Sequence, residues 1–456
     1  MTTAASPPAV QQPAWPDAVA LARVRQELAR RPALVEPADA EALRLRLADA
    51  AAGRAFVLQA GACAETFADA TAEGTRSLVR LLLQMALVLT WGAQVPVVKV
   101  GRLAGQFGKP RSADSETVDG VVLPVYRGDA VNDLRADPAA RTPDPDRLLR
   151  AYDASRTVLD ALAATAHDGE ASLEQVHAWT ADFAEGHPAA RRYAHVADEV
   201  DAALAFMRAI GVDVGDAGGP ASRVDAWTSH EALLLDYERP LTREVDGRRW
   251  ATSGHLVWVG ERTRDPEGAH VAWAASVANP VGVKLGPSAR PDDVLRLADA
   301  LDPDGVPGRL VLVPRMGAAH VREVLPPLVE AVREAGRPAL WVCDPMHGNT
   351  RTTSDGRKTR HLADVVDEVD GFFAVHAAAG TWPGGLHVEL VGSDVTECLG
   401  GGADLTELDL PQRYETACDP RLNAAQSLEL AFEAASLLRE TRASRRSRRA
   451  EDGRRG

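Results

Sequence analysis

The sequence predicts an α/β protein built as a (β/α)8 TIM barrel, with an N-terminal helical extension and a helical insertion after the second strand. The first observation is a series of eight short apolar runs of strand length. The second is that helical patterns separate most of these runs, as in a barrel of parallel strands. The third is that each run ends beside polar or charged residues, which predicts functional side chains at one end of the barrel.

The apolar runs begin at residue 55, and the third is the weakest because it lacks a continuous β-branched core. In chain order they are Ala55–Gly61, Val95–Gly101, Arg223–Thr228, His255–Gly260, Val281–Gly286, Arg309–Arg315, Ala339–Asp344 and Gly385–Gly392. Helical patterns are expected at Glu73–Gly92, Asp265–Val277, Pro291–Leu301, Ala319–Gly336 and His361–Ala379, with a closing helix at Asn423–Thr441.

Residues 1–53 are expected to form the helical extension. Pro16-Asp17 opens one helix, Ala18–Arg30, and Pro37 opens a second, Ala38–Ala52. The catalytic barrel domain is placed at 54–440, and the basic segment 441–456 is expected to be a disordered tail.

The long gap between the second and third runs predicts an insertion at about 133–222. It follows a polar loop at Phe107–Asp133 and holds helical patterns at Pro145–Ala164, Leu173–Glu185 and Ala189–Ile210. The extension and the insertion are where we expect effector binding and subunit contacts.

The composition narrows the class of protein. The net charge of −14 argues against general nucleic-acid binding, although the tail carries seven Arg against Glu451 and Asp452. No run has the length or apolar character of a membrane span, and the first residues do not have the pattern of a signal peptide. The four cysteines show no CxxC spacing, so we expect a cytoplasmic protein with reduced thiols.

Lysine is rare in this chain. Of 51 basic residues only Lys99, Lys109, Lys284 and Lys358 are lysines, so arginine supplies nearly all generic positive charge. A lysine that persists is a candidate for a place that needs a compact ammonium on a flexible stem, with chance as the alternative.

The strand ends supply two chemical sets. Four cations, Arg102, Arg262, Lys284 and Arg315, would concentrate positive charge in a cleft of an acidic protein, and such a cleft requires an anion. The segment Lys109-Pro-Arg111-Ser112 adds a second basic cluster beside glycines. We therefore expect two anionic groups, most simply two phosphorylated substrates.

The second set consists of Cys63, His347, Glu389 and Asp419. A thiolate, an imidazole and two carboxylates suit a divalent transition metal such as Mn, Fe, Co or Zn better than Mg or Ca. Taken alone, Cys63 is more often a small buried side chain and His347 an ordinary polar one; only a barrel brings them to one face. The other cysteines, Cys343, Cys398 and Cys418, are interpreted as structural.

Several long blocks resemble a known family. They are Gly101-Arg-Leu-Ala-Gly-Gln-Phe-Gly-Lys-Pro-Arg-Ser112, Gly260-Glu-Arg-Thr-Arg264, Asn279-Pro-Val-Gly-Val-Lys-Leu-Gly-Pro287, Asp344-Pro-Met-His-Gly-Asn-Thr350 and Val395-Thr-Glu-Cys-Leu-Gly-Gly401. These blocks are similar to those of the type II 3-deoxy-D-arabino-heptulosonate 7-phosphate (DAHP) synthases, the family that opens the shikimate pathway. The resemblance covers most of the chain, from about Phe56 to Phe432.

The resemblance implies a metal-dependent, aldol-like condensation of phosphoenolpyruvate with D-erythrose 4-phosphate that releases phosphate. By position, the implied metal ligands are Cys63, His347, Glu389 and Asp419. The implied phosphoenolpyruvate site consists of Arg102, Glu261, Arg262, Lys284 and Arg315. The implied erythrose 4-phosphate site consists of Lys109, Arg111 and Ser112. Lys284, Arg102 and Glu261 are the implied catalytic residues. The implied metal is Mn or Co, with Zn, Fe or Cd as alternatives, and the implied partners are further copies in a dimer or tetramer and a chorismate mutase.

Three positions depart from the family pattern: Ala62 for the usual Asp, Trp382 for His, and Gly254 for Ala. Ala62 and Trp382 are candidates for altering the support of the metal. Two alternatives therefore stay open. One is a synthase that takes a modified aldose phosphate such as an amino sugar phosphate, and the other is a regulatory relative without turnover.

Overall fold

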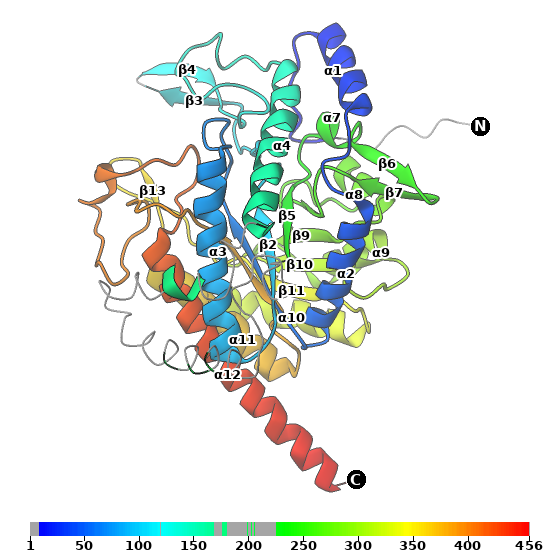
Figure 1. Cartoon of the computed structure of the whole chain (residues 1–456), viewed down its shortest axis with the longest axis vertical. Coiled ribbons are helices and arrows are strands. Elements are labelled where there is room, and N and C mark those ends of the chain that lie inside the picture. The colour runs from blue at the N-terminus through cyan, green and yellow to red at the C-terminus, as the bar shows by residue number, and fades with distance from the viewer. Residues whose placement is uncertain are drawn as a thin grey trace.

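In the computed structural model, the described residues are 9–118, 120–167, 176–179, 198, 202, 205 and 225–455. Within them eight parallel strands close into a barrel in chain order (Figure 1). The strands are β1 (Phe56–Gly61), β2 (Val97–Arg102), β5 (Ala226–Glu231), β8 (Leu256–Val259), β9 (Val281–Leu285), β10 (Leu310–Pro314), β11 (Leu340–Cys343) and β14 (Gly385–Glu389). The predicted barrel is confirmed, and the weak third run holds a strand that lies about three residues later than expected.

The register of β1 sets the level of the site. Gly61 lies opposite Arg102 on one side and Glu389 on the other, so these side chains emerge at the same height. Gly61 has φ +154°, and a Cβ atom there would lie 2.5 Å from the carbonyl oxygen of Arg102. Glycine therefore permits the close approach of β1 and β2 at the end of the barrel where the site forms.

Helices surround the barrel with their apolar faces inward. They are α3 (Ala72–Ala93), α8 (Ala269–Ser276), α9 (Pro291–Leu301), α10 (Val321–Glu334), α11 (Leu362–Ala379) and α12 (Ala424–Arg455). Sequence signals set several ends: α9 begins with Pro291, and α11 stops at Gly380, which has left-handed backbone. Helix α8 begins four residues later than predicted because Asp265 accepts hydrogen bonds in a turn that includes Pro266.

The two N-terminal helices pack on the barrel body. Helix α2 (Pro37–Ala51) buries Leu43, Leu47 and Ala50 against the lumen residues of the strands. Burial of each leucine contributes about 1.5–3 kcal/mol to the stability of the fold. Helix α2 therefore covers the apolar side chains of the strands and keeps them from water. Helix α1 (Ala18–Arg30) packs against α4 (Asp146–His167) and the short helix α7 (Leu235–Glu238).

Among the residues that the structure describes, three hairpins and a short 3-10 helix, η1, flank the barrel. The hairpins pair β3 (Ser115–Val118) with β4 (Val121–Pro124), β6 (Thr242–Val245) with β7 (Arg248–Ala251), and β12 (Arg351–Thr352) with β13 (Lys358–Thr359), and η1 spans Leu410–Gln412. The first hairpin lies in the segment predicted as a polar loop. Helix α4 matches the first helix expected in the insertion, whereas the patterns at 173–185 and 189–210 lie largely outside the described residues. Within the described part of the chain, no helix is both long and apolar enough to cross a membrane.

The C-terminal segment differs from the prediction of a disordered tail. Helix α12 does not end near Thr441 but continues to Arg455, and its last turns extend beyond the barrel (Figure 1). Alanine and arginine favour helix, and the barrel supplies anchors. The guanidinium of Arg445 lies 5.1 Å from the centre of the Trp382 ring, and Arg442 donates to the carbonyl oxygen of Gln94.

Trp382 lies at the end of the barrel opposite the candidate metal ligands. It precedes β14, and its indole Nε1 donates to the carbonyl oxygen of Ala55, just before β1, at 3.1 Å. The expectation that Trp382 alters the support of the metal is therefore wrong. Its observed role is to fasten α12 to the start of the barrel.

We predict that Arg445→Ala lowers the free energy of unfolding by about 1 kcal/mol, because it removes a cation–π contact. Urea unfolding measures this, with Arg446→Ala as the matched control, since Arg446 is exposed one position along the same helix. Equal losses in both variants would contradict an anchoring role for Arg445.

Candidate active site

A cavity of about 250 Å³ opens at the carboxyl ends of the barrel strands. Eleven of the twelve site residues expected from the sequence line it: Cys63, Arg102, Lys109, Arg111, Ser112, Glu261, Arg262, Lys284, Arg315, His347 and Asp419. The twelfth, Glu389, is fully buried beside it. The barrel thus brings together residues that are up to 356 positions apart in the chain.

Glu389 lies among nitrogen atoms of side chains that come from different parts of the barrel. Arg102 Nη2 and His347 Nε2 each lie 3.0 Å from its Oε1 atom, and Arg360 Nη2 lies 2.8 Å from Oε2. Burial alone would raise the pKa of Glu389, but His347 and Arg360 outweigh it and hold that pKa well below the ordinary value. Glu389 is therefore an ionised, fully paired carboxylate.

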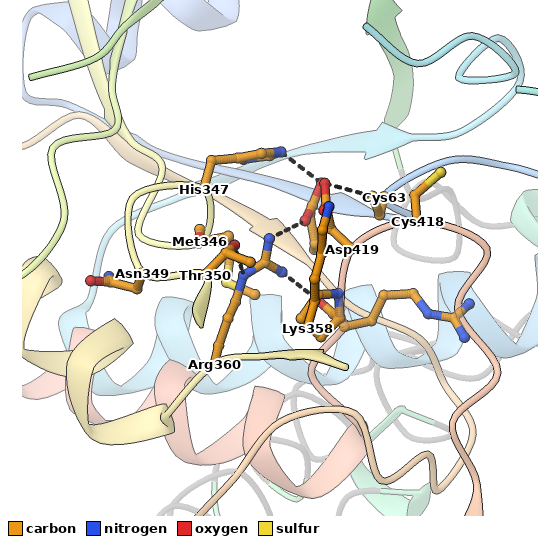
Figure 2. A network of polar contacts seen from close by, with 12 residues as sticks. Cys63, Met346, His347, Asn349, Thr350, Lys358, Arg360, Cys418 and Asp419 are labelled. Atoms are coloured by element: carbon orange, nitrogen blue, oxygen red, sulfur yellow. Dashed lines mark hydrogen bonds and ion pairs between the residues drawn. The ribbon is translucent and has the colours of Figure 1, made fainter. Parts of the chain in front are cut away.

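Cys63 and Asp419 meet beside Glu389. The Cys63 Sγ atom lies 3.6 Å from Asp419 Oδ2, and Lys109 Nζ lies 2.6 Å from that oxygen and 2.9 Å from the sulfur. Lys358 Nζ contacts the other Asp419 oxygen at 2.7 Å. Figure 2 shows His347 directed toward this group from the other side.

The donor set fits a divalent transition metal. One ligand atom from each of Cys63, Glu389 and Asp419 lies within 4.8 Å of the others, and His347 Nε2 points at Glu389. Burial, aided by Glu389, raises the pKa of the Cys63 thiol well above its ordinary value. A metal ion here would reverse that shift, because a coordinating thiol is deprotonated.

Asp344 links the candidate metal ligand to the cationic set. Its Oδ2 atom lies 2.5 Å from Lys284 Nζ and 2.7 Å from His347 Nδ1, while Oδ1 accepts from the backbone amide of Met346. Burial opposes ionisation, but His347 and Lys284 hold the pKa of Asp344 well below its ordinary value. Burial also lowers the pKa of Lys284 to about 8, against the opposing effect of Asp344.

The remaining expected residues each contact another residue of the site or of a neighbouring loop. Arg262 Nη2 donates to Ser112 Oγ at 2.7 Å, and Arg315 Nη2 donates to the carbonyl oxygen of His347 at 2.9 Å. Glu261 is engaged, because it accepts from the amide of Gly286 at 2.6 Å and pairs with Arg264. Arg111 Nη2 lies 3.0 Å from Glu116 Oε2.

Glu231 is a cavity residue that lies outside the motifs singled out in the sequence. It ends β5 and lines the cavity, and its buried Oε1 atom has no hydrogen-bond partner among the residues that the structure describes. Burial raises its pKa although Lys109 and Lys284 lie nearby. A carboxyl group of this kind is suited to holding or moving a proton.

Other residues were also missed. Asp344 sits inside a motif that was singled out, and Lys358 is one of the four lysines, so both carried a signal. Arg360 carried none, since it is one arginine among many. Cys418, interpreted as structural, instead lines the cavity, whereas Cys343 and Cys398 are buried in the core as expected.

We predict that Arg360→Met lowers the free energy of unfolding by about 3–5 kcal/mol, because it removes the contact to the buried Oε2 atom of Glu389, while Arg102 and His347 contact only Oε1. Arg357→Met is the control: its pair with Asp355 is largely exposed, so its loss is expected to stay within about 0.5 kcal/mol. Chemical unfolding of both variants is the measurement. A loss for Arg360→Met no larger than the control's would show that the pair with Glu389 is not important for stability.

The fold and this cavity define a (β/α)8-barrel protein whose cavity at the carboxyl ends of the strands is rich in arginines and lysines. The model of the class-II DAHP synthetase family matches residues 1–435, and the chain belongs to that family. It is 52% identical over 436 residues to a phospho-2-dehydro-3-deoxyheptonate aldolase of Streptomyces coelicolor, covering 95% of this chain and 96% of that protein.

It is also 50% identical over 447 residues to the AroG phospho-2-dehydro-3-deoxyheptonate aldolase of Mycolicibacterium smegmatis, covering 96% of this chain and 95% of that protein. A solved structure of phospho-2-dehydro-3-deoxyheptonate aldolase from Francisella tularensis matches with a TM-score of 0.48 and 12% identity. It covers 92% of this chain and 97% of that chain.

Proposed function

We propose that this chain is a DAHP synthase that condenses phosphoenolpyruvate with D-erythrose 4-phosphate, giving DAHP and phosphate in the first step of the shikimate pathway. The observation that carries the proposal is one cavity that holds a cationic set and a candidate metal cluster joined through Asp344. The family and the names of its relatives support it.

Phosphoenolpyruvate carries a carboxylate and a phosphate, and both need cations. Arg102, Lys284 and Arg315 line the cavity, and guanidinium and ammonium donors suit such oxygens. Arg262 completes this set. Holding both anionic ends fixes carbon 3 of phosphoenolpyruvate for attack, which is the proximity contribution to the rate.

We assign the aldose phosphate to the neighbouring part of the cavity. Ser112 and Arg111 lie there, and Arg262 reaches Ser112, so the two substrate regions adjoin. Lys109 was expected to face the aldose phosphate, yet its ammonium contacts Cys63 and Asp419. In this proposal Lys109 therefore stands between the sugar phosphate and the metal ligands.

The reaction forms one carbon–carbon bond and one carbon–oxygen bond to water, breaks the bond between carbon 2 and the phosphate oxygen, and protonates the aldehyde oxygen to a hydroxyl group. Carbon 3 of phosphoenolpyruvate attacks the aldehyde carbon of the sugar phosphate, water adds at carbon 2, and phosphate leaves. Cys63, His347, Glu389 and Asp419 would hold a divalent metal, Mn or Co in this proposal, which supplies Lewis-acid polarisation of the aldehyde oxygen when bound. Glu231, with its raised pKa, is the candidate to take a proton from the added water.

The proposal extends to the setting of the enzyme. A cytoplasmic homo-oligomer, dimer or tetramer, with a chorismate mutase as partner, is what membership in this family suggests. Retention of every expected site residue around one cavity favours turnover over a regulatory copy without activity.

We predict that metal-stripped protein releases no phosphate from the two substrates and that added Mn or Co restores release. Cys63→Ala is expected to lower the restored rate on the order of 100-fold or more, because it removes a metal ligand. Cys398→Ala is the matched control, since Cys398 is buried outside the cavity. Phosphate release with an amino sugar phosphate but not with erythrose 4-phosphate would overturn the assigned aldose. No release with any metal from folded protein would overturn the proposed activity.

We predict that phosphoenolpyruvate binding weakens as pH rises through about 8, the value to which burial lowers the pKa of Lys284. Below this pH the ammonium is charged and attracts the ligand; above it, affinity falls by up to about tenfold per pH unit. Calorimetric titration across this range is the measurement. Lys284→Arg is the control, because a guanidinium stays charged, and the same decline in that variant would contradict the role of Lys284.

A further inference from the structure

Two loops at the carboxyl end of the barrel meet backbone to backbone. One follows β10 and begins with Arg315; the other follows β11 and contains His347. Gly317 has φ +85°, and a Cβ atom there would lie 2.8 Å from the carbonyl oxygen of Gly348. Glycine at this contact lets the two chains touch directly, so the loops are built as one unit.

Glu368, a residue of helix α11, accepts hydrogen bonds from both loops. Its Oε1 atom accepts hydrogen bonds from the backbone amides of Met316 and Gly317, both at 2.8 Å. Its Oε2 atom accepts from the side-chain amide of Asn349 at 2.8 Å. One carboxyl group therefore holds the β10 loop and the β11 loop at the same time.

Asn349, in the β11 loop, also accepts a hydrogen bond from the β10 loop. Its Oδ1 atom accepts from the backbone amide of Ala318 at 2.9 Å, and its Nδ2 also donates to the carbonyl oxygen of Pro345 at 2.8 Å. Asn349 thus ties its own loop to the β10 loop. Its side chain points away from Cys63 and Asp419 (Figure 2).

Placing a carboxyl group here is costly. Glu368 is fully buried, and burial raises its pKa to about 8 although three donors face it; Asp344 adds a like charge nearby. An apolar side chain would avoid the desolvation cost but would leave two backbone amides and an asparagine without acceptors. The carboxyl group of Glu368 is explained by the two loops that it holds together.

We propose that Glu368 and Asn349 are positioning residues that fix the separation between Arg315 and His347, and so between bound phosphoenolpyruvate and the metal. The inference rests on the proposed function, which places these two residues in the two sites. Arg315 also donates to the carbonyl oxygen of His347 at 2.9 Å, so a shift of one loop moves both groups. Neither positioning residue lines the cavity, so neither is expected to touch substrate.

The test separates positioning from stability with two variants. Glu368→Gln keeps the size of the side chain but sets a donor against the Asn349 amide. Asn349→Ser removes the side-chain hydrogen bonds of Asn349 to Glu368, Ala318 and Pro345, and it leaves the two hydrogen bonds of Glu368 to backbone amides in place. Asp367→Asn is the matched control, because it removes the adjacent carboxylate of α11, which is exposed and lies 2.9 Å from Arg322.

Dissociation constants for Mn²⁺ alone and for phosphoenolpyruvate alone are measured by calorimetry, together with urea unfolding. We expect both constants to rise about tenfold in Glu368→Gln and in Asn349→Ser, the scale found when a residue that supports a metal ligand is lost. The double variant is expected to be no weaker than the weaker single one, since the two residues act as one link. Asp367→Asn is expected to bind as the wild type does.

Unchanged constants in both variants would overturn the inference, even if the free energy of unfolding falls, because the role would then be structural only. If Glu368→Gln does not fold, Asn349→Ser decides the matter alone. Wild-type protein that binds neither ligand would overturn the proposed function and this inference with it. Wild-type binding with unaffected variants would overturn this inference alone.

Discussion

The carboxylate of Glu389 is the constraint around which the site is organised. A buried charge is tolerated only when it is paired, and its partners, Arg102, His347 and Arg360, come from β2, the β11 loop and the segment after β13. Closure of the barrel brings these partners to Glu389, and the ionised carboxylate in turn holds them together. The same closure places Cys63 and Asp419 beside it, so the candidate metal cluster is a product of the fold.

Other acidic side chains stabilise the loops by accepting hydrogen bonds from backbone amides. Glu65 accepts from the backbone amides of Ala104, Gly105 and Gln106. Glu368 likewise accepts from amides of the loop after β10, and Asp344 accepts from the amide of Met346 in its own loop. These carboxylates are occupied by the backbone, which leaves arginines and lysines to face the cavity. A chain with a net charge of −14 can in this way present a cationic site.

The sequence predicted the barrel because buried parallel strands form near-continuous apolar runs, and it predicted that polar side chains gather at one end of the barrel because polar residues follow those runs. It could not predict the partner of Glu389, since nothing distinguishes Arg360 from the other arginines before the chain is folded. It also missed the length of α12, whose helix depends on contacts such as Arg445 with Trp382. What escaped prediction consists of long-range pairs, which leave no local pattern.

The most direct test of this account is a crystal structure with Mn²⁺ and phosphoenolpyruvate, with the metal located by its anomalous scattering. The account predicts one strong peak bound by Cys63, His347, Glu389 and Asp419, with phosphoenolpyruvate against Arg102, Lys284 and Arg315. A peak elsewhere, or phosphoenolpyruvate bound away from that metal, would contradict the assignment of this cavity as the active site.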